Sequence, residues 1–232
     1  MSFHATKLKQ RFLILLLLGI TSFQAWSQVA DSPLVFASPG GITTSFIEAP
    51  ALANNATGGG SSSDTKWLKI EFKYTVAPTK GDYLDSVQFK IWVEGLDLLA
   101  PNAPGNDGVA VALTGSVTYV NIPKGKDIYG VFYVHPSTLG RYSKQGPTDF
   151  ERKFNIHLDA LIDGKVVDNI DKNKETDLTW YQKLTTTIPG LVYQQNQSPF
   201  LLSDPSKYPA IKLPPPPIDS TSTAPPAAAP AQ

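Results

Sequence analysis

The chain has 232 residues, with 20 Lys and Arg against 20 Asp and Glu, 20 Pro, 17 Gly, 3 His and no Cys. The lack of Cys excludes disulfide scaffolds, Cys-ligated metal centres, thiol nucleophiles and lipid anchors on cysteine, and three His leave little for His-based metal or acid–base chemistry. A formal net charge of zero disfavours a nucleic-acid partner, because nucleic acids attract concentrated Lys and Arg.

Residues 1–27 have the pattern of a secretory signal peptide. Three basic residues precede a nine-residue apolar core at 12–20, and Ala-Trp-Ser at 25–27 fits a small-x-small cleavage site. Nine residues are too few to span a bilayer of about 30 Å. We therefore expect export, with residues 28–33 as a short lead of the mature chain; a retained membrane anchor is the alternative.

Residues 34–212 are expected to form one domain, because apolar and polar residues alternate with period two along most of this region. Such alternation is typical of strands with one buried and one solvated face. A glycine at 115 interrupts one of these runs and indicates a bulge or a bend. The expected strands are residues 34–37, 68–76, 85–94, 109–119, 128–134, 154–162 and 165–167, with weaker candidates at 178–187 and 190–193.

The clearest turn is Asp163-Gly164, which separates two alternating runs. Asp-Gly in this position favours a type I′ hairpin, because both turn residues need positive φ. No segment of eleven or more residues shows the apolar spacing of an amphipathic helix. The sequence therefore predicts an all-β protein, an antiparallel immunoglobulin-like β-sandwich of about eight strands.

Residues 213–232 are rich in Pro and Ala and include four consecutive prolines. Prolines in series favour polyproline II, and this composition cannot bury a core. We expect a disordered tail; a spacer or docking peptide is the alternative.

One polar loop gathers oxygen ligands of the kind that Ca²⁺ prefers. Asp171, Asn173, Glu175 and Asp177 alternate along the chain, which predicts a calcium site. However, two lysines interleave with them, and the glycine and closing Glu of an EF-hand are missing, so a polar connection is the alternative. A loop at residues 102–108 is a weaker second candidate, and no other cofactor is expected.

Two tryptophans, Trp67 and Trp92, fall on the polar phase of their strands, opposite the buried residues. A tryptophan exposed on a flat sheet stacks well against a sugar ring, because the indole is a rigid apolar platform. We therefore take both as candidate ligand-binding residues. A protein interface and local packing are the alternatives.

The histidines of the predicted domain, His135 and His157, lie in no recognisable catalytic motif. His157 falls on the polar phase of its strand, so we expect it on a solvated face. The carboxylates are scattered without a pattern. The sequence therefore predicts a protein that is not an enzyme; a carboxylate pair assembled by the fold is the alternative.

Residues 128–134 are apolar or aromatic on both faces, which suits a central strand or one whose outer face is buried in an assembly. The aromatic segment YGVFYVHPSTLGRY at 129–142, together with a signal peptide and a Cys-free β-rich body, resembles the secreted pilus-like proteins of Akkermansia-type verrucomicrobia. The resemblance covers residues 34–212 and implies an immunoglobulin-like β-sandwich similar to archaeal pilin domains. The chain departs from type IV-like pilins in having no long apolar N-terminal helix.

These observations predict a non-enzymatic, exported protein of the cell envelope, at the outer membrane surface or in the periplasm. The expected role is in pilus-like or adhesive assembly, with other envelope or pilus-like proteins, copies of itself included, as partners. The alternative is a carbohydrate-binding module that holds a glycan on Trp67 and Trp92. Neither a nucleic-acid partner nor a transmembrane span in the mature chain is expected.

Overall fold

The computed structural model describes residues 32–37, 40–50, 66–100, 108–146, 149–150, 154–173 and 179–214. The predicted signal peptide and most of the predicted tail lie outside the described residues. Among these residues, no helix is both long enough and apolar enough to span a membrane.

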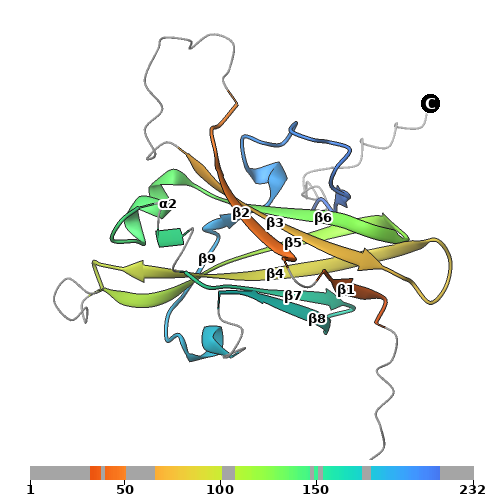
Figure 1. The fold of residues 1–232 in the computed structure, drawn as a ribbon, viewed down its shortest axis with the longest axis horizontal. Coiled ribbons are helices and arrows are strands. Elements are labelled where there is room, and N and C mark those ends of the chain that lie inside the picture. The colour runs from red at the N-terminus through yellow and green to blue at the C-terminus, as the bar shows by residue number, and fades with distance from the viewer. Residues whose placement is uncertain are drawn as a thin grey trace, which may run out of the picture. The chain divides into compact units, whose positions relative to one another are not determined.

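Two β-sheets pack face to face as a sandwich (Figure 1). Nearly all neighbouring strands run antiparallel, so the predicted all-β sandwich is confirmed. The first sheet, here sheet A, contains β1 (Leu34–Phe36), β2 (Ile42–Ile47), β3 (Trp67–Val76), β6 (Gly125–Val134) and β10 (Val192–Tyr193). The second, sheet B, contains β4 (Tyr83–Asp97), β5 (Val109–Pro123), β7 (Ile156–Ile162), β8 (Lys165–Lys172), β9 (Thr187–Pro189) and β11 (Ala210–Ile211).

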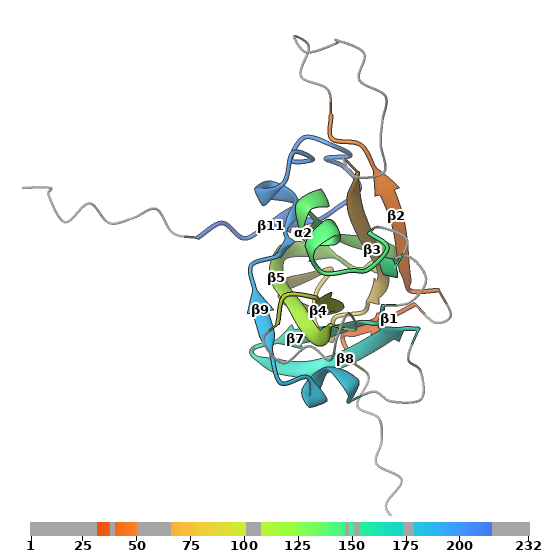
Figure 2. The ribbon, with the colours of Figure 1, turned by 90° about the vertical axis from the view of Figure 1, so that its left-hand side faces the viewer.

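Strand β3 organises sheet A. It pairs with β6 along one edge, while β1 and β2 share its other edge one after the other. In sheet B, β4 lies between β5 and β7, and the outer edge of β5 carries both β11 and the parallel strand β9. Figure 2 shows β9 and β11 together on the side of the sandwich away from β2.

The core lies between the sheets and is filled by the inward residues of the alternating strands. Its centre is aromatic: Phe72 and Phe89 stand 4.6 Å apart between ring centroids and join sheet A to sheet B. On the side of β8 the sheets are also tied by a hydrogen bond of 2.7 Å from the Phe36 amide to the Asp168 carboxylate. One continuous core therefore spans the domain.

The predicted hairpin at Asp163-Gly164 is confirmed. Both residues have positive φ, 51° and 76°, as a type I′ turn requires. Ile162 and Lys165 pair directly across the turn, so its loop has two residues.

Several elements differ from the prediction. A strand was expected at 178–187, but the 3₁₀ helix η2 (Trp180–Lys183) occupies much of that range. The edge strand β2 and the short helix α2 (Pro136–Arg141) were not expected. Both lack a long periodic pattern: β2 is six residues of mixed polarity and α2 is less than two turns.

The two-sided apolarity of residues 128–134 has a local cause. The outer face of β6 is covered by the chain's own residues 193–208, which include η3 (Gln195–Gln197). Phe200 stacks on Tyr133 at 4.7 Å, and Val131 is fully buried. The strand therefore buries its outer face within the monomer rather than through a partner.

Gly115 does not mark a bulge, because β4 and β5 keep a continuous register through it. A Cβ at this position would lie 2.2 Å from the main-chain oxygen of Val192. The glycine thus lets the chain cross from β9 in sheet B to β10 in sheet A directly over β5.

Gly115→Ala is expected to lower the free energy of unfolding by about 1–3 kcal/mol, since the backbone near Val192 must shift to make room. Gly140→Ala is the matched control, because a Cβ there meets nothing within 4 Å and alanine favours the helix. Urea unfolding measures both variants. Equal stability of the two would contradict the proposed close approach.

Candidate functional site

The strongest candidate site lies on the outer face of sheet B, around the middle of β4. Residues directly opposite in neighbouring strands share a face. Trp92 of β4 pairs with Thr114 of β5 on one side and with His157 of β7 on the other. Lys90 shares this outer face, two residues earlier in β4.

His157 is buried, not solvated as its polar phase predicted, and only 2% of its surface is exposed. Its Nδ1 lies 3.1 Å from both carboxylate oxygens of Asp171, and its Nε2 lies 3.0 Å from Asp159 Oδ1. Burial alone would lower its pKa, but the hydrogen bonds and charges of the two carboxylates raise the pKa of His157 to about 9. The imidazole is therefore a buried cation with both nitrogens engaged, which makes it a structural group rather than a general base.

The 3₁₀ helix η2 is the cover that the sequence did not reveal. The Tyr181 ring stacks on His157 with centroids 3.9 Å apart, and the Trp180 indole donates a 2.9 Å hydrogen bond to Asp171 Oδ1. Trp180 is buried and Tyr181 partly exposed, which agrees with the two neighbours facing opposite ways. The outward face of β7 at His157 is thus covered by η2, a segment whose own sequence shows no alternating or helical pattern.

Trp92 is half-buried and held against this cluster. Its ring centroid lies 4.8 Å from that of Tyr181 and 5.5 Å from that of His157. The side of Trp92 toward β7 is therefore packed. Trp92 also lines a groove, together with Thr114 of β5.

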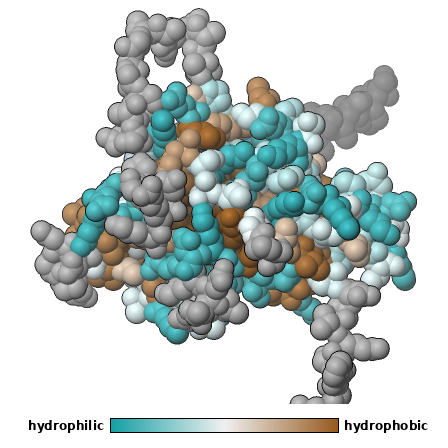
Figure 3. Space-filling view, in the orientation of Figure 1, coloured by the Kyte–Doolittle hydropathy of each residue, from teal (hydrophilic) through white to brown (hydrophobic). Residues whose placement is uncertain are grey.

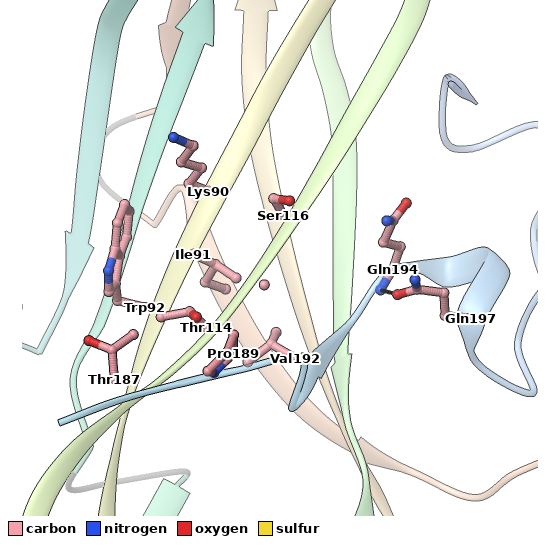
Figure 4. Close-up of a pocket in the computed structure, with 12 residues that line it drawn as sticks. Lys90, Ile91, Trp92, Thr114, Ser116, Thr187, Pro189, Val192, Gln194 and Gln197 are labelled. Atoms are coloured by element: carbon pink, nitrogen blue, oxygen red, sulfur yellow. Dashed lines mark hydrogen bonds between the residues drawn. The ribbon is translucent and has the colours of Figure 1, made fainter. Parts of the chain in front are cut away.

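The groove has a volume of about 490 Å³ and crosses the outer face of β4 and β5. In Figure 4, Trp92 lies at one end, Gln194 and Gln197 at the other, and Ser116 between them. Of the side chains that line it, the only charged one is Lys90.

The far wall of the groove is fixed by hydrogen bonds around η3. The main-chain N–H of Gln194 donates a hydrogen bond to Gln197 Oε1 at 3.3 Å. Gln195 Nε2 donates to the carbonyl oxygens of Phe200 and Ser203 at 3.2 and 2.6 Å. These hydrogen bonds fix the shape of the wall.

Ser116 lies where the outer edge of β5 is open. Strand β9 pairs with residues 112–114 and β11 with residues 119 and 120. The carbonyls of Thr114 and Thr118 accept hydrogen bonds from Gly190 and Lys212 on this edge, so the main-chain groups of Ser116 also point toward it. Within the described strands, the main-chain N–H and C=O of Ser116 have no strand partner on this edge of β5, and both groups face the groove.

A second polar cluster fixes residues 193–208 on sheet A. Glu71 Oε2 accepts hydrogen bonds from Lys207 Nζ at 2.8 Å and Tyr208 Oη at 2.6 Å, and Lys69 Nζ lies 2.9 Å away. Burial would raise the pKa of Glu71, but these donors lower it to about 2. Glu71 therefore stays ionised and anchors the segment.

The prediction that Trp67 is exposed is wrong. Its exposed fraction is 8%, and its ring contacts His135, Tyr193 and Phe200 at centroid distances of 4.6, 5.9 and 5.8 Å. It lies on sheet A, whereas Trp92 lies on sheet B, so the two tryptophans do not form one platform. Alternation along β3 could not show that Trp67 is covered, because most of the covering side chains come from residues 193–208, more than a hundred positions later.

The predicted calcium loop is described only in part. Asp171 is bound to His157 and Trp180, and Asn173 Nδ2 donates to the Phe154 carbonyl at 2.8 Å, so both already have partners. Glu175 and Asp177 lie outside the described residues, as does nearly all of the loop at 102–108. In the described part of the chain, no three His, Asp or Glu side chains are grouped so that they could hold a metal ion.

A protein-family model matches residues 35–213, which is most of the chain. A crystal structure of a protein from Akkermansia muciniphila has the same fold, with a TM-score of 0.59 and 19% identity, over 78% of this chain and 93% of that chain. No curated protein matches the chain. The family match covers both sheets and the segment that lies on sheet A.

Proposed function

Because this chain belongs to the family of Akkermansia-type pilus-like proteins, we propose that it is an exported, non-enzymatic protein of the cell envelope that takes part in pilus-like or adhesive assembly. The family match over residues 35–213 is the observation that carries the proposal. The signal-peptide pattern of residues 1–27 supports export, to the outer membrane surface or the periplasm.

A contact point for partners is supported by two exposed leucines. Leu201 and Leu202 are 54% and 86% exposed, directly after the buried Phe200. The buried ring holds the start of this loop on β6, so the leucines project from an anchored base. Exposed apolar side chains gathered at one point are typical of protein contacts. The proposed partners are other envelope or pilus-like proteins, copies of this chain included.

The face seen in Figure 3 has apolar residues in separate patches between hydrophilic ones. On this face, contacts of limited area are favoured over one large apolar interface.

A non-enzymatic role is supported by the state of His157. Both of its nitrogens are held by carboxylates and its ring lies under Tyr181, so a substrate has no access to it. The proposed role needs no bound cofactor. Turnover in a broad screen of glycosidase and esterase substrates would contradict this part of the proposal.

Fractionation of the cells that make the protein tests the envelope role. The mature chain should be recovered mainly with sheared surface appendages or the outer membrane. The double variant Leu201→Ser/Leu202→Ser should move to the soluble fraction while unfolding like the wild type, since exposed positions tolerate such changes within about 0.5 kcal/mol.

Leu99→Ser is the matched control, because Leu99 is 71% exposed and lies in the turn after β4. It should fractionate like the wild type. A wild-type chain found wholly in the soluble periplasm would overturn the assembly role. An equal loss for both variants would overturn the contact at Leu201 and Leu202.

A further inference from the structure

We propose that the groove on sheet B binds a short saccharide that carries an acidic group, with a sugar ring stacked on Trp92 and the acidic group at Lys90. This site is a different surface from the proposed envelope contact, because neither Leu201 nor Leu202 lines the groove, although η3 adjoins both. It also differs from the pair of tryptophans expected from the sequence, since Trp67 is buried and has no part in it.

Trp92 has the properties of a preformed stacking platform. Its indole is packed on Tyr181 and His157, which fixes the position of the ring. Trp92 is also one of the residues that line the groove. A fixed aromatic ring gains apolar contact with the C–H face of a sugar and loses little conformational entropy.

Lys90 supplies the positive charge. It lies two residues from Trp92 on the same face of β4, a spacing of about 7 Å along a strand. A ligand with an acidic group beside its stacked ring can reach both. Among the described residues Lys90 has no ion-pair partner. Asp159 lies directly opposite it on β7 and already accepts a hydrogen bond from His157. The ammonium is therefore available to an anion.

The rest of the groove offers uncharged hydrogen-bonding groups. Thr114 and Ser116 line its floor, and Gln194 and Gln197 line its far wall. The main-chain groups of Ser116 add a donor and an acceptor at the open edge of β5. These hydroxyl and amide groups can form hydrogen bonds with a ligand that is rich in hydroxyl groups. A volume of about 490 Å³ lies within the range of small-molecule sites.

An extended peptide added to the β5 edge is the rival occupant. The open edge is short, because β9 and β11 pair on either side of Ser116. An added strand needs main-chain hydrogen-bond partners along several residues. Between β9 and β11, this edge offers the main-chain groups of Ser116 alone. The groove therefore favours a saccharide.

The test is isothermal titration of the full chain with 3′-sialyllactose and 3′-sulfolactose, which carry a carboxylate and a sulfate, and with neutral lactose. At least one anionic probe should bind and quench tryptophan fluorescence, and lactose should bind about tenfold or more weakly. The stronger of the two anionic probes identifies the acidic group.

Three variants locate the site. Lys90→Gln should weaken the anionic probe to the level of lactose, whereas Lys124→Gln, an exposed lysine outside the groove, should leave binding unchanged. Trp92→Ala should abolish binding of every probe. Because that change also disturbs the packing on Tyr181, Ser116→Gln provides a second variant, which fills the groove from an exposed position and should block binding with an unchanged melting temperature.

Absence of binding by both anionic probes at millimolar concentration would overturn the proposal. So would equal binding of lactose, or an equal effect of Lys90→Gln and Lys124→Gln. If the saccharides fail and an extended peptide binds, and if Ser116→Gln abolishes that binding, the groove would be assigned to strand addition instead. None of these results bears on fractionation, so a failure here leaves the envelope role standing.

Discussion

Replacing Phe89 by Ala is expected to lower the free energy of unfolding by about 3–5 kcal/mol, which removes much of the stability of a typical domain. Phe89 is completely buried in β4. Its ring centroid lies 4.6 to 5.9 Å from those of Phe36, Phe72, Tyr74 and Tyr119, which come from both sheets. Truncation therefore opens a cavity at the point where the sheets meet.

Tyr83→Ala is the matched control, since Tyr83 belongs to the same strand and is 60% exposed. Its effect should stay within about 0.5 kcal/mol. Urea unfolding followed by tryptophan fluorescence measures both variants. Similar losses for Phe89 and Tyr83 would contradict a core centred between the sheets.

Because His157 is buried and charged, we expect the free energy of unfolding to fall as the pH rises into the alkaline range. Its pKa is about 9 in the folded protein against an ordinary value of 6.5. A raised pKa means that the folded state holds this proton more tightly than the unfolded chain. The stabilisation is therefore complete below about pH 6.5 and is lost as pH rises through 9. The total change is on the order of 3 kcal/mol.

Urea unfolding at pH 6, 7.5 and 9.5 measures this dependence, and His157→Gln should flatten it. The variant leaves Asp159 and Asp171 without their cation, and loss of one partner of a buried ion pair is strongly destabilising. If it fails to fold, NMR titration of the wild-type imidazole gives the same information. A His157 pKa near 6.5, or equal stability at all three pH values, would contradict the arrangement.

The long strands were predictable because their cause is local. In β3, β4, β5 and β7 the residues that face the core are apolar and those between them are mostly polar or small, so these stretches of sequence alternate clearly with period two. The type I′ hairpin was predictable for the same reason, since Asp163-Gly164 sets the turn by its own φ preferences. The short elements β9, β10 and β11 are too brief to carry a period, and partners distant in the chain define them.

The site was predictable only in part. The position of Trp92 on the solvated face of β4 could be derived from alternation alone, and its partial exposure agrees. Trp67 and His157 obey the same alternation, yet both are buried, because residues 193–208 cover one sheet and η2 covers the other. Period two distinguishes the two faces of a strand but contains no information on what later segments cover. Lys90 and Ser116 are direct partners in the β4–β5 pair, but Gln194 and Gln197 reach them only through the crossing from β9 to β10, which no local pattern indicates.

The path of residues 180–211 also has a consequence for synthesis. Chains leave the ribosome from the N-terminus, so β1 to β8 emerge before any of this segment exists. At that stage Trp67, Val131 and Tyr133 have no cover, and the outer edge of β5 has neither β9 nor β11. An unfinished chain therefore presents an aromatic surface and an open strand edge, both of which promote aggregation. The last stretch of the domain to be translated is thus the part that closes it, and a chain truncated before Phe200 should depend on chaperones to stay in solution.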